Sequence, residues 1–146
     1  MTEMLSPVHI LLIEDNLGDI ELTREALRIS KIANRLTVVQ NGRSALDMLE
    51  AAEKEDQLPD LVLLDLNLPG ISGSEVLSRI KGTPGWARIP IVILTSSQAE
   101  ADIVKSYELH ANCYVTKPLD FSQFIHVVRS IEDFWFTLVR LPRRDA

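Results

Sequence analysis

The sequence predicts an α/β fold in which a parallel sheet of five strands is wound on both faces by five helices. The first observation is a set of short, continuous apolar runs of the kind that form strands covered on both faces. The second is that segments with helical spacing separate these runs, and this alternation requires right-handed crossover connections. The expected strands lie at residues 8–13, 36–39, 61–64, 91–94 and 113–115, and the second is the most amphipathic.

Between the expected strands, apolar side chains recur every three or four residues, which is the spacing of one helix face. The first three stripes follow Asp19, Asn41-Gly42 and Ser72-Gly73, and the fourth follows Ser96-Ser97. A fifth helical stretch runs from residue 120 to about 131. The stripes are Ile20, Thr23 and Leu27; Ala45, Leu46 and Leu49; Val76, Leu77 and Ile80; and Ile103, Val104 and Tyr107.

Length and composition favour one domain. The chain has 146 residues, of which 46% are hydrophobic, and its single cysteine, Cys113, cannot form an internal disulfide. We expect one domain over residues 1–146, with a core at about 8–134 and a C-terminal extension at 135–146. A net charge of -6 argues against nucleic-acid binding. The apolar run near the start is too short for a signal peptide or a membrane span, so we expect a soluble, cytoplasmic protein.

Polar residues follow the expected strands at the points where the strands end. Glu14 and Asp15 come after the first strand, Asp65 ends the third, Thr95 ends the fourth and Lys117 follows the fifth. In open α/β sheets the ligand site lies in the crevice at the carboxyl ends of the strands. The sequence therefore predicts that three carboxylates, a hydroxyl and an ammonium group meet at one edge of the sheet.

This residue set suits phosphoryl transfer. Crowded carboxylates repel one another unless a cation is present, and an all-oxygen ligand set selects a hard ion such as Mg²⁺. We expect Asp15 and Asp65 to bind Mg²⁺ directly and Glu14 to bind it through a water. Asp65 is then a suitable nucleophile toward phosphorus, and Lys117 and the Thr95 hydroxyl can neutralise the equatorial oxygens.

Each of these residues also has an ordinary structural interpretation. Glu14 and Asp15 alone would be solvated loop residues, Asp65 a turn or helix cap, and Thr95 a β-branched strand residue. Lys117-Pro118 alone would be a turn. The functional interpretation is favoured because the residues coincide at the ends of four of the five strands.

These residues together resemble the receiver domains of response regulators. The resemblance rests on Glu14-Asp15, on Asp65 within the segment 63–70, on Thr95 and on Lys117-Pro118. It implies a flavodoxin-like strand order of 2-1-3-4-5, with Asp65 as phosphoacceptor and Lys117 and Thr95 contacting the phosphoryl group. It further implies that the Asn67 backbone carbonyl binds Mg²⁺ beside Asp15 and Asp65. Thr95 and Tyr114 would then form the switch that relays phosphorylation.

A narrower resemblance, in segments 14–19, 106–114 and 131–135, is to the small regulators that accompany bacterial phytochrome histidine kinases. It implies a light-sensing histidine kinase as phosphodonor, a homodimer and no output module. The rings of Phe134, Trp135 and Phe136 cannot all lie on the one face of a helix that packs against the sheet. We therefore expect a second copy of the protein to cover them, and they are the candidate dimer surface. The alternative is that Trp135 folds back onto Trp86 or the fifth helix. We interpret Trp86 as a packing anchor in the loop after the third helix.

Other function classes fit less well. A haloacid-dehalogenase phosphatase would carry a second aspartate two residues after Asp65, as general acid and base, and that position is Asn67. A flavin carrier would need a Ser-, Thr- or Gly-rich phosphate loop where Glu14 and Asp15 stand. A pseudo-receiver that acts by binding or dimerisation alone remains the alternative. We expect a phosphoacceptor signalling protein and not an enzyme acting on a separate substrate.

Overall fold

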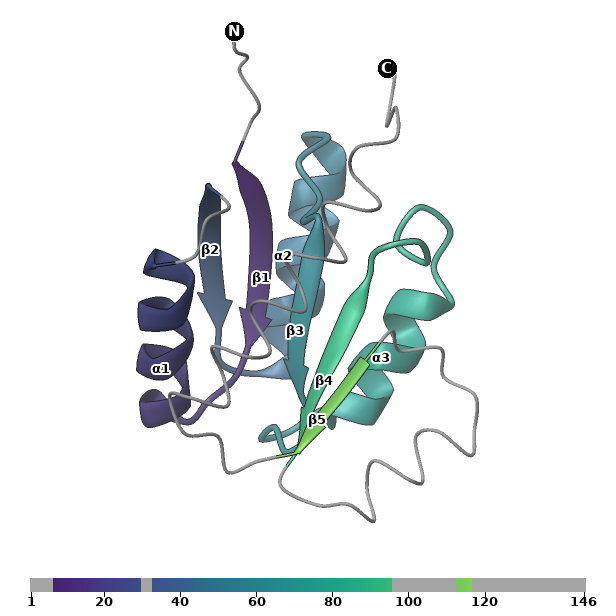
Figure 1. Ribbon diagram of the computed structural model, residues 1–146. Coiled ribbons are helices and arrows are strands. Elements are labelled where there is room, and N and C mark those ends of the chain that lie inside the picture. Colours follow the sequence, from purple (N-terminus) through teal and green to yellow (C-terminus); the bar gives the residue numbers. More distant parts are fainter. Residues whose placement is uncertain (1–6, 30–32, 96–112, 117–146) are drawn as a thin grey trace, which may run out of the picture.

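The computed structural model describes residues 7–29, 33–95 and 113–116, and these form one parallel sheet with helices on both faces (Figure 1). The strand order is β2-β1-β3-β4-β5, as the family resemblance implies. The arrowheads of all five strands point to the same edge of the sheet in Figure 1. The strands are β1 (Val8–Ile13), β2 (Asn34–Val39), β3 (Leu61–Asp65), β4 (Ile91–Thr95) and β5 (Cys113–Thr116). The fourth and fifth predicted helices, at residues 103–107 and 120–131, lie outside the described residues.

Three helices are described: α1 (Leu17–Arg28), α2 (Gly42–Lys54) and α3 (Gly73–Lys81). Each begins at a side chain that accepts a hydrogen bond from the backbone N–H three residues later, which satisfies one of the free donors of the first turn. The caps are Asn16, bonded to Asp19 at 2.9 Å; Asn41, bonded to Ser44 at 2.8 Å; and Ser72, bonded to Glu75 at 3.2 Å. None of these described helices has the length and hydropathy needed to cross a membrane.

Strand β1, which lies between β2 and β3, separates two apolar clusters, because successive side chains of a strand point to opposite faces. Leu11 and Ile13 join the cluster beneath α2 and α3, whereas Ile10 and Leu12 join the cluster beneath α1. All six residues of β1 are buried, which explains why this strand reads as a continuous apolar run. The sheet is therefore packed on both faces, and its carboxyl edge is the end of this packed layer.

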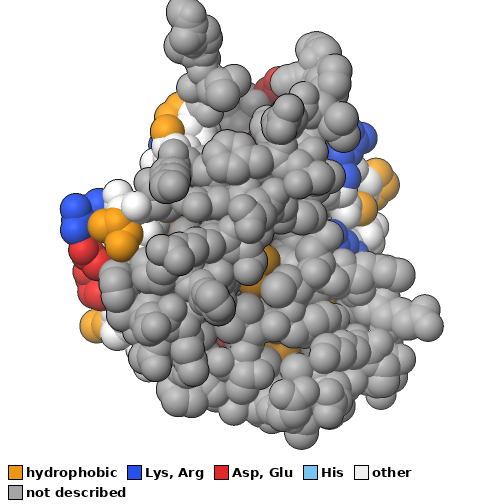
Figure 2. Space-filling view, viewed as in Figure 1, with side chains coloured by type: hydrophobic (Ala, Val, Ile, Leu, Met, Phe, Trp, Pro, Cys, Tyr) orange, Lys and Arg blue, Asp and Glu red, His pale blue; other side chains and the backbone are white. Residues whose placement is uncertain are grey.

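The outer face of α1 carries charges of both signs. Figure 2 shows acidic and basic side chains next to one another on the left, where Figure 1 places this helix. Glu21 pairs with Arg24 at 3.6 Å, and Glu25 pairs with Arg28. Because these pairs are exposed, each contributes little to stability, and α1 is held mainly by its buried face.

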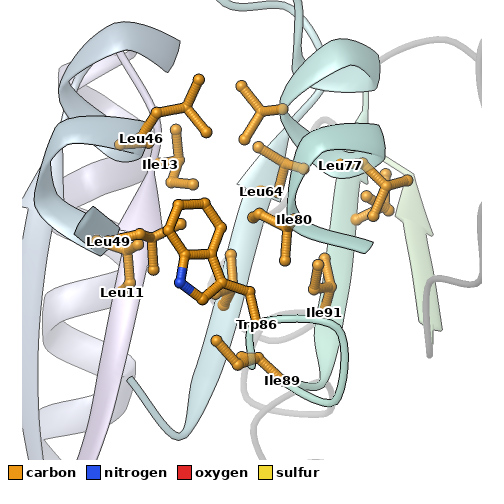
Figure 3. Packing of buried hydrophobic residues seen from close by; sticks show 14 of the residues in the cluster. Leu11, Ile13, Leu46, Leu49, Leu64, Leu77, Ile80, Trp86, Ile89 and Ile91 are labelled. Carbon is orange, nitrogen blue, oxygen red and sulfur yellow. The ribbon is translucent and has the colours of Figure 1, made fainter. Parts of the chain in front are cut away.

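Trp86 anchors the loop between α3 and β4. Its side chain is 5% exposed and lies among Leu49 of α2, Ile80 of α3 and Ile89 of the same loop (Figure 3). The interpretation of Trp86 as a packing anchor is confirmed. The indole Nε1 is buried and has no hydrogen-bond partner in the described part of the chain, so the residue acts through its apolar surface.

Lys81 holds the same loop from its other side. The Nζ atom, at the end of α3, donates hydrogen bonds of 2.9 Å to the backbone carbonyls of Ala87 and Ile89. Partial burial lowers the pKa of this lysine. The ammonium group replaces water as the partner of two loop carbonyls, which ties the loop to the helix.

A buried histidine lies near the amino end of β1. His9 Nε2 is 3.0 Å from the Thr37 hydroxyl on β2, while Nδ1 is buried and makes no hydrogen bond to any described residue. The backbone N–H of His9 donates to the Asp60 carboxylate at 2.9 Å. Burial lowers the pKa of His9, the charge of Arg35 lowers it further, and Asp60 and the backbone of Gln57 partly oppose both.

Acidification is expected to destabilise the protein through His9. Because its pKa is lowered in the folded state, the unfolded state binds the proton first as the pH falls below about 6.5. The neutral ring therefore contributes stability at neutral pH that is lost with falling pH, at a slope of at most about 1.4 kcal/mol per pH unit. Urea unfolding between about pH 7 and pH 5 should show a smaller loss for His9→Gln, which does not titrate there. Parallel pH profiles would contradict the assignment.

Candidate functional site

The carboxyl edge of the sheet brings Glu14, Asp15 and Asp65 together. Ile13, the last residue of β1, is in register with Leu64 of β3, so the next residues on the two strands, Glu14 and Asp65, lie side by side. Asp15 follows directly in the turn to α1. One carboxylate oxygen from each of the three lies within 4.8 Å of the others. The structure thus places the three acidic residues of the predicted site in one cluster.

Burial differs among the three carboxylates. The Glu14 side chain is fully buried and that of Asp65 is 3% exposed, whereas Asp15 is exposed. The backbone N–H of Asn16 donates to Glu14 Oε2 at 3.2 Å, and that of Asn67 donates to Asp65 Oδ1 at 3.0 Å. These amides hold the two buried groups in place, and Asp15 forms the open side of the cluster.

The cluster fits a small divalent cation. Its donors are all carboxylate oxygens, and placing buried carboxylates together is costly without a compensating positive charge. With Mg–O distances of about 2.1 Å, opposite ligands of an octahedral ion lie roughly 4.2 Å apart. The three carboxylate oxygens lie within 4.8 Å of one another, a spacing compatible with ligands gathered around one such ion.

The remaining predicted residues are placed to different extents. Asn67 is exposed in the loop that leaves β3. Leu94 of β4 is in register with Asp65, so the backbone of Thr95 lies one residue further toward the same edge. Tyr114 belongs to β5 and pairs with Ile93. The side chains of Thr95 and Tyr114 lie outside what the structure describes. So do Lys117, Phe134, Trp135 and Phe136.

Sequence reasoning missed the role of Gly73. The dipeptide Ser72-Gly73 predicted only the start of a helix, but the structure packs Gly73 directly against the backbone of Asp65. A glycine at the first position of a helix, eight residues after a strand-end aspartate, was the available signal. This spacing indicates a contact with Asp65 only once the path of the intervening loop is known.

The family model for the response regulator receiver domain matches residues 10–129. Among curated proteins, the chain is 43% identical over 138 residues to the response regulator Rcp1 of Synechocystis, covering 93% of this chain and 94% of that protein. It is also 38% identical over 141 residues to the probable methanogenesis regulatory protein FilR2 of Methanothrix harundinacea, covering 96% and 91%.

Solved structures give the same result. The crystal structure of the phosphorylated cyanobacterial phytochrome response regulator RcpA superposes with a TM-score of 0.79 at 43% identity, covering 90% of this chain and 96% of that chain. The Mn²⁺-bound form of Rcp1 gives 0.77 at 43% identity with the same coverage. The bacteriophytochrome response regulator AtBRR gives 0.74 at 42% identity, again covering 90% and 96%. The chain belongs to the response regulator receiver domain family, and its role is in two-component signalling.

Proposed function

We propose that this protein accepts a phosphoryl group from a histidine kinase on Asp65, with Mg²⁺ bound at the carboxyl edge of the sheet. The observation that carries the proposal is the cluster of Glu14, Asp15 and Asp65, whose carboxylate oxygens lie within 4.8 Å of one another. Asp65 is the best acceptor because it ends the central strand β3 and is held by the Asn67 amide.

The chemistry is an in-line phosphoryl transfer. A carboxylate oxygen of Asp65 forms a bond to phosphorus while the P–N bond to the donor histidine breaks, and the imidazole nitrogen leaves with the bonding electrons. A bound Mg²⁺ would supply neutralisation of the negative charge shared by the phosphoryl oxygens and the carboxylates. Lys117 and the Thr95 hydroxyl act on the same oxygens in this proposal.

The ligand assignment is the one that the resemblance to receiver domains implies. Asp15 and Asp65 bind Mg²⁺ directly, together with the backbone carbonyl of Asn67, and Glu14 binds through a water. The Mn²⁺-bound form of Rcp1 supports a divalent cation in this family.

Replacing Asp15 by Asn is expected to lower Mg²⁺ affinity by at least about tenfold, since losing even a supporting group of a metal site has that effect. Titration calorimetry at fixed ionic strength measures this loss. Asp47→Asn is the matched control, because Asp47 is an exposed acid on α2 outside the cluster and its replacement makes the same charge change. Equal affinities in the two variants would remove Asp15 from the ligand set.

The proposal extends to partners and switching. Relatives named as phytochrome or bacteriophytochrome response regulators support a phytochrome-type light sensor as the donor kinase. Thr95 and Tyr114 relay the phosphorylated state, and Phe134, Trp135 and Phe136 form the surface of a homodimer. The protein is one receiver domain over residues 1–146 that acts in the cytoplasm, away from membranes and nucleic acid, and signals by protein–protein interaction without turning over a separate substrate.

A further inference from the structure

Helix α3 begins in direct contact with the end of β3. Gly73, its first residue, is buried, and a Cβ atom built there would lie 2.4 Å from the Asp65 carbonyl oxygen and 2.5 Å from Leu66 Cα. Ordinary contacts between such atoms begin at roughly 3.4–3.5 Å. A methyl group at position 73 would therefore need the helix or the strand end to move by about 1 Å.

The same short stretch of backbone holds the Asp65 side chain. The Gly73 N–H donates to the Leu66 carbonyl at 3.1 Å, which closes the loop between β3 and α3. Asn67, which follows Leu66 in the chain, donates its N–H to Asp65 Oδ1 at 3.0 Å. A displacement of Leu66 would thus move both the backbone of Asp65 and the amide that orients its carboxylate.

We propose that Gly73 is a positioning residue for Asp65, whose missing side chain lets α3 lie against the strand end and hold the carboxylate where the cation and phosphoryl group bind. The inference rests on the proposed role of Asp65. The need for glycine at position 73 is steric and not conformational. Only Gly70 and Gly85 are glycines with positive φ in the described residues. The backbone conformation at position 73 would accept alanine if space allowed.

Gly42 provides a matched control. It is the buried first residue of α2, and a Cβ there would lie 2.9 Å from Val76 Cγ2 and 3.0 Å from both Ile71 Cβ and the Ile71 carbonyl. Gly42→Ala therefore also introduces a methyl group into a tight helix start. Its close contacts are on α3 and the preceding loop, and none is with Asp65 or Leu66.

The test compares Mg²⁺ affinity in Gly73→Ala, Gly42→Ala and the unchanged protein, with far-UV circular dichroism to verify folding. We expect Gly73→Ala to weaken Mg²⁺ binding about 10- to 100-fold, the range seen when the support of a metal ligand is lost. Gly42→Ala should lose clearly less affinity than Gly73→Ala, because its contacts are longer and are made with Ile71 and Val76 and not with Asp65 or Leu66. A folded Gly73→Ala variant with unchanged affinity would overturn the inference.

A second readout separates this inference from the function it rests on. Without Mg²⁺, the Asn67 backbone amide should change its NMR chemical shift in Gly73→Ala and keep it in Gly42→Ala. If the unchanged protein failed to bind Mg²⁺, the proposed function would fall, and the Asn67 resonance would still decide the role of Gly73. An unshifted resonance would overturn it.

If Gly73→Ala does not fold, the inference can still be tested on the unchanged protein by hydrogen exchange. Coupling between two sites is reciprocal, so if contact at Gly73 favours Mg²⁺ binding, Mg²⁺ must favour that contact. Hydrogen exchange at the Gly73 N–H should then slow on adding Mg²⁺. Exchange at the Ala45 N–H, which donates to the Asn41 carbonyl at the start of α2, should not slow. Equal exchange at Gly73 with and without Mg²⁺ would overturn the inference.

Discussion

Asp65→Asn is expected to abolish phosphoryl acceptance while leaving the fold intact. The unchanged protein, incubated with acetyl phosphate and Mg²⁺, should gain one labile phosphoryl group by mass spectrometry. The variant should gain none, because an amide oxygen is a far weaker nucleophile than a carboxylate. The substitution keeps the shape of the side chain and an acceptor for the Asn67 amide, so the circular dichroism spectrum should not change.

Asp47→Asn serves again as control and should be phosphorylated like the unchanged protein. A labile adduct that persists in Asp65→Asn would move the acceptor to another residue. An unchanged protein that gains no phosphoryl group, even with rapid sampling, would favour the pseudo-receiver that works by binding alone. Size-exclusion chromatography of the same samples shows whether the protein is a dimer and whether phosphorylation alters its assembly.

Trp86→Ala is expected to cost about 3–5 kcal/mol of unfolding free energy, the usual effect of removing a large buried ring. That is a large share of the roughly 5–15 kcal/mol that stabilises a domain. The loss follows from the position of the indole between α2, α3 and the loop before β4 (Figure 3). Urea unfolding followed by far-UV circular dichroism measures it.

Trp86→Phe separates packing from hydrogen bonding. The indole Nε1 makes no hydrogen bond within the described residues, so Trp86→Phe removes only part of the apolar contact. Its loss of unfolding free energy should be less than half of the loss in Trp86→Ala. Equal losses in the two variants would show that the indole nitrogen has a partner. A loss below about 1 kcal/mol in Trp86→Ala would contradict the anchor.

The alternation of strands and helices could be predicted from periodicity, whereas the strand order was implied by the resemblance to receiver domains. Buried strands give continuous apolar runs, and parallel strands end at one edge, so Glu14 and Asp65 had to be neighbours if β1 and β3 paired. The positions of Thr95 and Asp15 at that edge followed in the same way.

Other features depend on distances that periodicity does not contain. His9 stands within an apolar run, and its contact with Thr37 appears only once β1 and β2 are aligned, with Leu11 opposite Thr37. Gly73 meets Asp65 because the loop after β3 turns back on itself. The bonds from Lys81 to the carbonyls of Ala87 and Ile89 likewise depend on the folded path of a loop.

The loop anchored by Trp86 and Lys81 enters β4 at its amino end, at the opposite edge of the sheet from the three carboxylates. The contacts that Trp86 and Lys81 make are thus separated from the residues that would do the chemistry, and mutations at distant sites usually have independent effects. Heat tolerance could therefore change over evolution, or be raised in the laboratory, by substitutions around this loop without altering how fast the signal is received or erased.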